Sequence, residues 1–153
     1  HETVGYTDYA LKQFFKSAQQ MPWFKNTVFV FTADHSAQSN ANKYKNRLGR
    51  YAIPFFLYAP SGELKGKSSD LFQHIDITPT LLSLVGNKQE IISFGNNAFD
   101  DSDKYSVQFI NNSYQITFKN NFLIFDGLKT TNYYNLKKDS LLANNLIKNL
   151  NTE

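Results

Sequence analysis

The sequence predicts an α/β fold, because segments with helical and strand-like apolar spacing alternate along its first half. A helical pattern over residues 3–20 precedes an apolar β-type run at 27–33. A second run of this kind covers residues 53–59, and a further helical segment ends at Gly86. Helix, strand, loop, strand and helix in this order are typical of α/β proteins.

The first element is predicted to be an amphipathic helix over residues 3–20. Its apolar residues recur at helical spacing, with Lys and Gln between them: Val4, Leu11, Phe14, Phe15 and Ala18. Pro22 lacks a backbone N–H, so the helix is expected to end before it.

The strand at 27–33 leads directly into two side chains that can bind a metal. Residues 28–35 read V-F-V-F-T-A-D-H, and such a continuous apolar run predicts a strand that is covered on both faces. Asp34 and His35 follow its carboxyl end, where open α/β sheets bind ligands. An Asp oxygen beside a His nitrogen suits zinc or manganese. The alternative is that Asp34 caps a turn and His35 is an ordinary surface residue.

The next segments are a polar loop, a strand and a helix. Residues 36–50 lack periodicity, which indicates a functional or mobile loop. Pro54 is expected near the beginning of the strand at 53–59. The segment that follows is predicted to be a helix. Thr78 is a suitable cap, Pro79 suits the first helical position, and Gly86 suits the left-handed end.

The last third of the chain has short β-prone runs. Residues 105–110, 114–118 and 122–125 are separated by Asn-rich turns, which predicts a small antiparallel meander. Its Tyr and Phe residues are interpreted as core rather than as a sugar-stacking surface. Residues 141–150 are predicted to form a final helix with Ser140 as its cap.

Composition narrows the function classes. The chain has 153 residues, 41% of them hydrophobic, a net charge of +3 and no cysteine. Disulfides, thiolate metal sites and cysteine nucleophiles are therefore excluded within it. Its basic residues are scattered, so no nucleic-acid partner is predicted. No run approaches the roughly 20 apolar residues that span a bilayer. The opening at His1 has the character of the middle of a longer polypeptide.

Five segments occur in the order found in one known family: Tyr6–Leu11; Asn26–His35; Arg50–Pro54 with Tyr58–Pro60; Ile75–Leu82 with Gly86; and Tyr134–Asp139 with Asn145–Leu146. Together they resemble the carboxyl-terminal half of a sulfatase-like catalytic domain of the alkaline phosphatase superfamily. The lipoteichoic acid synthase and phosphoglycerol transferase branch is the most similar. The resemblance implies that residues 1–153 are the carboxyl-terminal part of one such domain, whose amino-terminal part is missing.

The resemblance implies a fold and a chemistry. The fold is an alkaline-phosphatase-like mixed sheet flanked by helices, with a small antiparallel meander near the carboxyl terminus. The chemistry is metal-dependent hydrolysis or transfer of a phosphoester or sulfate ester. Asp34 and His35 would be ligands of a divalent metal ion (Mn, Zn or Ca). The nucleophile and further carboxylate ligands lie upstream in such enzymes, so the chain is expected to be inactive alone.

Other charged residues near these motifs have two interpretations each. Arg47 and Arg50 are candidate substrate-binding residues because Arg binds anions in a bidentate manner; alternatively, Arg50 pairs with a structural carboxylate. His74 is interpreted as a residue on the approach to a helix cap rather than as a third ligand. Asp76 is expected to make a local hydrogen bond ahead of the cap at Thr78.

The resemblance leaves several functions open. In the most similar branch, the domain lies on the extracytoplasmic side of the cell membrane, is anchored by upstream segments and acts on lipid-linked substrates. The alternatives are a glycan or small-molecule sulfatase and a non-catalytic sulfatase-like binding module. In each case exposed apolar surface is expected where absent elements would pack.

Overall fold

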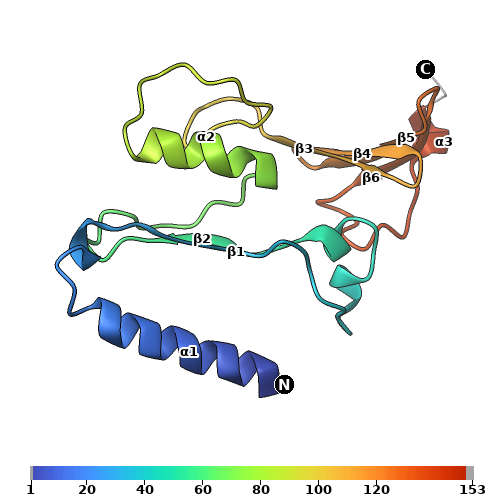
Figure 1. Ribbon diagram of the computed structural model, residues 1–153. Coiled ribbons are helices and arrows are strands. Elements are labelled where there is room, and N and C mark those ends of the chain that lie inside the picture. Colours follow the sequence, from blue (N-terminus) through green and yellow to red (C-terminus); the bar gives the residue numbers. More distant parts are fainter. Residues whose placement is uncertain (1, 151–153) are drawn as a thin grey trace. The chain divides into compact units, whose positions relative to one another are not determined.

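The structure is a computed structural model that describes residues 2–150, and these residues form two compact units. The first unit contains residues 2–38 and Tyr51–Lys67. The second contains Ser39–Arg50 and residues 68–150. Each unit has its own sheet (Figure 1).

The predicted first helix is confirmed as α1 (Glu2–Ala18) in the first unit. The helix ends before Pro22, and the Met21 N–H donates to the Ala18 carbonyl in the turn that follows. Ala18 is buried and Phe15 is half-buried. Val4, at the other end of the apolar stripe, is 71% exposed. Within the described residues, only the carboxyl-terminal part of the stripe is therefore buried.

The two predicted strands are confirmed as β1 (Phe29–Thr32) and β2 (Phe55–Tyr58). They pair antiparallel with Phe31 opposite Phe56, and these two rings stack with centroids 4.5 Å apart. Helix α1 lies along this face of the pair (Figure 1), where the Phe15 ring is 4.9 Å from that of Phe29. Aromatic packing between α1 and β1 thus fixes the strand that precedes the candidate metal ligands.

The prediction that β1 is covered on both faces is wrong for the described residues. Exposure alternates along the strand, and Val30 is 37% exposed on the face opposite Phe29 and Phe31. The pairing is antiparallel, which permits one solvated face. The run is continuous because apolar side chains lie on both faces of β1, although α1 covers only the face of Phe29 and Phe31.

The loop at 36–50 is ordered by its own side chains and belongs largely to the second unit. It contains the short 3₁₀ helices η2 (Asn42–Tyr44) and η3 (Gly49–Tyr51). The Asn46 side chain donates to the Ser140 carbonyl at 3.1 Å and accepts from the Gly49 N–H at 2.7 Å. The bond from Gly49 orders the loop itself, and the bond to Ser140 holds the loop against the last third of the chain.

Helix α2 (His74–Leu84) begins four residues before the expected cap at Thr78. The N-cap is Gln73, whose N–H donates to the Asp76 carboxylate at 2.8 Å. Pro79 consequently lies in the helix interior rather than at its first position. The expected left-handed end is confirmed, because Gly86 has a φ of 74°.

The loop after α2 packs closely on the carbonyl that Pro79 leaves without its helical partner. Proline at position 79 cannot donate to the carbonyl of Ile75, four residues earlier. Gly95 lies directly over that carbonyl, and any Cβ at Gly95 would overlap the Ile75 carbonyl group. The missing side chain at Gly95 is therefore what allows the loop to approach the helix.

Substitution of this glycine is expected to destabilise the second unit. Gly95→Ala forces backbone to move against backbone, and we expect it to lower the free energy of unfolding by about 1–3 kcal/mol in urea titrations. The control is Gly5→Ala in α1, where no atom lies within 4 Å of the new Cβ. That variant is expected to gain about 0.5–1 kcal/mol. Equal effects of the two substitutions would contradict the close packing at Gly95.

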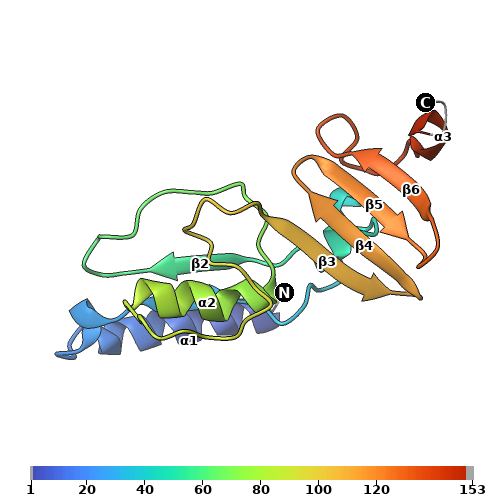
Figure 2. The ribbon, with the colours of Figure 1, turned by 90° about the horizontal axis from the view of Figure 1, so that it is seen from above.

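The predicted meander is confirmed and has one more strand than the sequence indicated. Strands β3 (Tyr105–Ile110), β4 (Ser113–Phe118), β5 (Asn121–Phe125) and β6 (Thr130–Asn135) pair antiparallel in chain order (Figure 2). Asn111 and Asn112 connect β3 to β4 with φ values of 51° and 55°. Two left-handed residues are what a tight type I′ hairpin requires.

The core of the second unit lies on one face of this sheet. Phe122, Ile124 and Tyr134 are buried there. Half-buried leucines from the loop at 39–50 and from the segment after β6 pack against them: Leu48, Leu136 and Leu142. The meander is thus closed on this face by the segment that contains Arg47 and Arg50.

The expected helix at 141–150 is wrong in most of its length. The structure has only α3 (Ile147–Leu150) in this region. Leu142 is left-handed, with a φ of 57°, and the Leu146 N–H donates to the Tyr133 carbonyl. The segment thus bonds to β6 instead of coiling. Among residues 2–150, no helix is both long and apolar enough to cross a membrane.

Candidate metal and ester site

Asp34 and His35 lie where the sequence places them, just after the carboxyl end of β1 at Thr32. Both side chains are exposed, His35 to 81% and Asp34 to 87%. The antiparallel partner β2 and helix α1 hold β1 in place, so the pair stands at the end of a packed strand. Both groups are accessible to a ligand from solvent.

The two side chains turn toward each other. Asp34 Oδ1 accepts the His35 N–H at 2.8 Å, and Asp34 Oδ2 lies 3.5 Å from His35 Nε2. His35 Nδ1 lies 3.1 Å from the Ser36 carbonyl oxygen. A proton on Nδ1 can donate to that carbonyl, which leaves the lone pair of Nε2 beside the free carboxylate oxygen.

This pair has the separation that one metal ion requires. Two donors bonded to a tetrahedral zinc at about 2.1 Å lie about 3.4 Å apart. The distance between Asp34 Oδ2 and His35 Nε2 is 3.5 Å, and nitrogen with oxygen is a suitable donor set. Residues 2–150 contain no group of three or more His, Cys, Asp or Glu that could hold a metal ion. A metal ion held by this pair would therefore take two ligands from it and need further ligands from elsewhere.

The other predicted site residues lie in the second unit. Arg47 is exposed in the loop after η2, and Arg50 is exposed within η3. His74 is the first residue of α2 rather than a residue before it. Asp76 makes the expected local hydrogen bond, but as the third residue of a helix capped by Gln73, so the expected cap at Thr78 is wrong.

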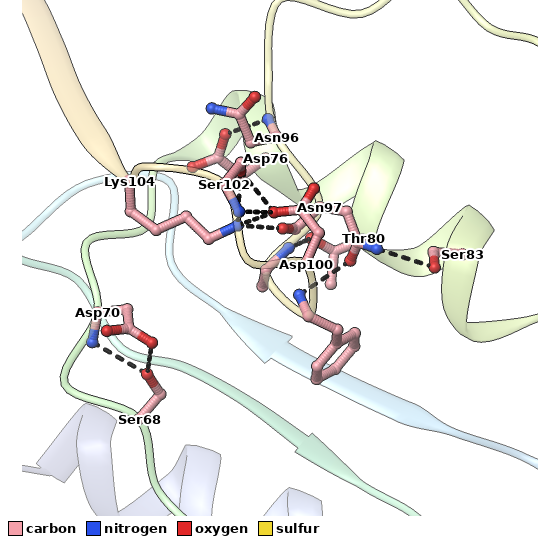
Figure 3. A network of polar contacts seen from close by, with 12 residues as sticks. Ser68, Asp70, Asp76, Thr80, Ser83, Asn96, Asn97, Asp100, Ser102 and Lys104 are labelled. Carbon is pink, nitrogen blue, oxygen red and sulfur yellow. Dashed lines mark hydrogen bonds and ion pairs between the residues drawn. The ribbon is translucent and has the colours of Figure 1, made fainter.

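A buried polar network that sequence reasoning missed ties the loop at 93–104 to α2 (Figure 3). Asp76 Oδ1 accepts the Asn96 N–H at 2.8 Å, and Thr80 Oγ1 accepts the Ala98 N–H at 2.9 Å. Asp76 is 4% exposed and Thr80 is fully buried. Asp76 and Thr80 are one helical turn apart, and this spacing of polar residues on a largely apolar helix was the available signal.

The network continues to an ion pair between Asp100 and Lys104 (Figure 3). Lys104 Nζ also donates to the Asn97 carbonyl, and the Ser102 hydroxyl donates to Asp100. The hydrogen bond from Lys104, followed by that from Ser102, lowers the pKa of Asp100 to about 2. This carboxylate stabilises a loop and is assigned no part in ester chemistry.

The Asp100 contact predicts a pH dependence of stability. The folded pKa of about 2 lies below the ordinary value of 3.8, so the contribution is present above pH 4 and is lost as the pH falls toward 2. Because Asp100 is partly exposed, the contribution is at most about 1 kcal/mol. Urea unfolding of the parent chain and Asp100→Asn should differ at pH 6 and converge near pH 2. Asp101→Asn removes the same charge and serves as the control; a difference that persists at pH 2 would contradict the assignment.

The comparisons with known proteins agree with the predicted family. The family model for sulfatases matches residues 1–87. The chain is 28% identical to an arylsulfatase of Clostridium perfringens, over 95% of this chain and 34% of that protein. It is 30% identical to lipoteichoic acid synthase 1 of Bacillus subtilis, over 99% of this chain and 25% of that protein. The chain thus spans between a quarter and about a third of these curated relatives.

The fold has a counterpart among solved structures. A Vibrio parahaemolyticus protein of the alkaline phosphatase superfamily superposes with a TM-score of 0.69 and 23% sequence identity. The match covers 96% of this chain and 40% of that protein. This likeness shows the fold, and the predicted α/β class with a small antiparallel meander is confirmed.

Proposed function

Because the chain belongs to the sulfatase family, we propose that it is the carboxyl-terminal part of a metal-dependent catalytic domain that hydrolyses or transfers a phosphoester or sulfate ester. The observation that supports this most is the pairing of Asp34 Oδ2 with His35 Nε2 at 3.5 Å, at the carboxyl end of a strand. The chain's short span relative to its relatives supports a partial domain.

Each predicted site residue has its own proposed task within its unit. Asp34 and His35 hold a divalent cation, for which Mn, Zn and Ca are the candidates. When bound, such a cation polarises an ester oxygen and neutralises negative charge in the transition state. The Ser36 carbonyl orients the His35 ring, and the His35 N–H orients the Asp34 carboxylate. Arg47 and Arg50 are proposed to bind anionic ester oxygens.

The more specific proposal is transfer of a lipid-linked phosphoglycerol or phosphoethanolamine group. It is supported by 30% identity to lipoteichoic acid synthase 1 over nearly the whole chain. We propose accordingly that the domain works at the cell membrane, on its extracytoplasmic side, and is anchored by segments outside this chain. Sulfate ester hydrolysis is the second candidate, supported by the similarity to an arylsulfatase.

The test uses the polypeptide encoded by the extended reading frame, supplied with Mn²⁺, Zn²⁺ or Ca²⁺. Phosphatidylglycerol vesicles, 4-nitrophenyl phosphate and 4-nitrophenyl sulfate distinguish the three ester classes. We expect turnover of one class that EDTA abolishes and the added metal restores. Turnover of none of them, by a folded protein that binds metal, would favour the non-catalytic binding module instead. The 153-residue chain alone is expected to be inactive.

A further inference from the structure

The outward face of the meander is apolar where an ordinary half-exposed sheet is polar. Along β3, Tyr105, Val107 and Phe109 point outward and are 39%, 41% and 62% exposed. The polar residues between them, Ser106 and Gln108, point to the inner face and are less exposed. This order is the reverse of the usual pattern, in which the polar face of a sheet meets water.

Strand β4 has the same arrangement as β3, with its apolar side chains outside and its polar side chains inside. Tyr114 points outward and is 44% exposed, while Gln115 and Thr117 on the inner face are 5% and 2% exposed. Gln115 Oε1 is buried without a hydrogen-bond partner among the described residues. Burial of a polar group without a partner is costly. In β3 and β4 the sequence therefore places polar side chains inside and aromatic ones outside. The expectation that the aromatic residues of the meander form its core holds for Phe122 and Tyr134 but is wrong for Tyr105, Phe109 and Tyr114.

The outward residues form one continuous surface, here called the outer sheet face. The strand register brings Phe109 opposite Tyr114 and Tyr114 opposite Phe125. The centroids of these ring pairs are 4.9 Å and 6.4 Å apart. The outer sheet face comprises eight residues of β3, β4 and β5: Tyr105, Val107, Phe109, Tyr114, Ile116, Phe118, Leu123 and Phe125.

The size and charge of the outer sheet face favour a second copy of the chain as its partner. None of its eight residues is charged. The Lys119 ammonium lies 4.7 Å from the centroid of the Phe118 ring, but it is paired with Asp103 at 3.4 Å, so two copies with a net charge of +3 each can meet there with this charge neutralised. With about 200 Å² for each fully exposed aromatic side chain, Tyr105, Val107, Phe109 and Tyr114 expose roughly 350 Å² of mainly apolar surface. The four half-buried residues of the face raise this area to roughly 500 Å². Two such faces bury roughly 1,000 Å², which is the size of a weak, transient interface.

We propose that the outer sheet face is an interface through which two copies of this chain associate. Flat sheet faces pack about 10 Å apart, with their side chains interdigitated. A two-fold axis brings the same patch of both copies together, so one apolar face is sufficient. The small area makes the dimer reversible.

Sedimentation equilibrium between about 5 and 500 μM tests the proposal. The apparent mass should rise with concentration from 17.6 kDa toward twice that value. Val107→Lys and, independently, Phe109→Lys place a charge in the face and should weaken dimerisation at least tenfold. Leu128→Lys is the matched control, because Leu128 is 93% exposed in the turn between β5 and β6, outside the face. This variant should dimerise like the parent chain.

A cross-linking experiment locates the contact without relying on charged variants. The sequence has no cysteine, so a single Phe109→Cys or Leu128→Cys substitution provides the one thiol available for an intermolecular disulfide. Mild oxidation should join Phe109→Cys chains and leave most Leu128→Cys chains single. A constant mass of 17.6 kDa for the parent chain would overturn the proposal. So would a dimer that persists in a folded lysine variant, or preferential cross-linking at Leu128→Cys, because each places the contact elsewhere.

Discussion

The variant His35→Ala is expected to bind Zn²⁺ at least tenfold more weakly than the parent chain. The parent chain provides Asp34 Oδ2 and His35 Nε2 at 3.5 Å, and the variant keeps only the carboxylate. Groups that only orient a metal ligand typically contribute tenfold to a hundredfold to affinity, and a ligand contributes at least as much. Isothermal titration calorimetry of the chain at pH 7.5 measures the change.

His74→Ala is the matched control for this prediction. His74 is also exposed, but it lies at the beginning of α2. Its removal should leave the Zn²⁺ affinity unchanged, whereas Asp34→Ala should reproduce the loss seen with His35→Ala. Equal weakening by His74→Ala and His35→Ala would show that the chain binds zinc through dispersed histidines, and the assignment of the site would be wrong.

Phe122→Ala is expected to have the largest effect on stability, a loss of about 3–5 kcal/mol. Phe122 is 1% exposed and its ring centroid lies 6.0 Å from that of Tyr134 in the core of the second unit. The substitution leaves a cavity between the sheet and the loop leucine Leu48. Urea unfolding followed by circular dichroism measures the loss.

Phe94→Ala removes the same atoms from a side chain that is 89% exposed. It should change the free energy of unfolding by less than about 0.5 kcal/mol. If both variants lost similar amounts, Phe122 would not be part of the main core, and the closure of the meander by the loop at 39–50 would be in doubt.

Most elements of the fold were predictable because local signals and packing agree. Alternating helical and strand-like spacing identified α1, β1 and β2, and the Asn pair at 111–112 identified the first hairpin of the meander. Pro54 stands immediately before β2, as its missing N–H requires. These features depend on neighbours in the sequence.

The errors arose where a distant contact overrides a local signal. Thr78 and Pro79 form a good helix start, but the helix already begins after its N-cap Gln73. The Asp76 carboxylate accepts the Gln73 N–H there and also accepts the N–H of Asn96 from the loop after the helix. Residues 141–146 have helical spacing, yet the Leu146 N–H bonds to the Tyr133 carbonyl. Burial of β1 was overestimated because an apolar run does not reveal how many layers cover it.

One feature of the candidate site was predictable from the sequence and another was not. Asp34 and His35 are adjacent in the sequence, so their proximity followed from their position after a strand. The face-to-face arrangement of Oδ2 and Nε2 depends on the bond from His35 Nδ1 to the Ser36 carbonyl, which spacing alone does not predict. Roles for Arg47 and Arg50 stay predictions.

Addition of Mn²⁺ to the ¹⁵N-labelled chain tests the central assignment most directly, because this paramagnetic ion broadens the amide signals nearest to it. Substoichiometric Mn²⁺ is predicted to broaden first the signals of residues 33–36, and Asp34→Ala should remove the effect. Broadening that begins elsewhere, or that is unchanged in Asp34→Ala, would contradict a metal site formed by Asp34 and His35.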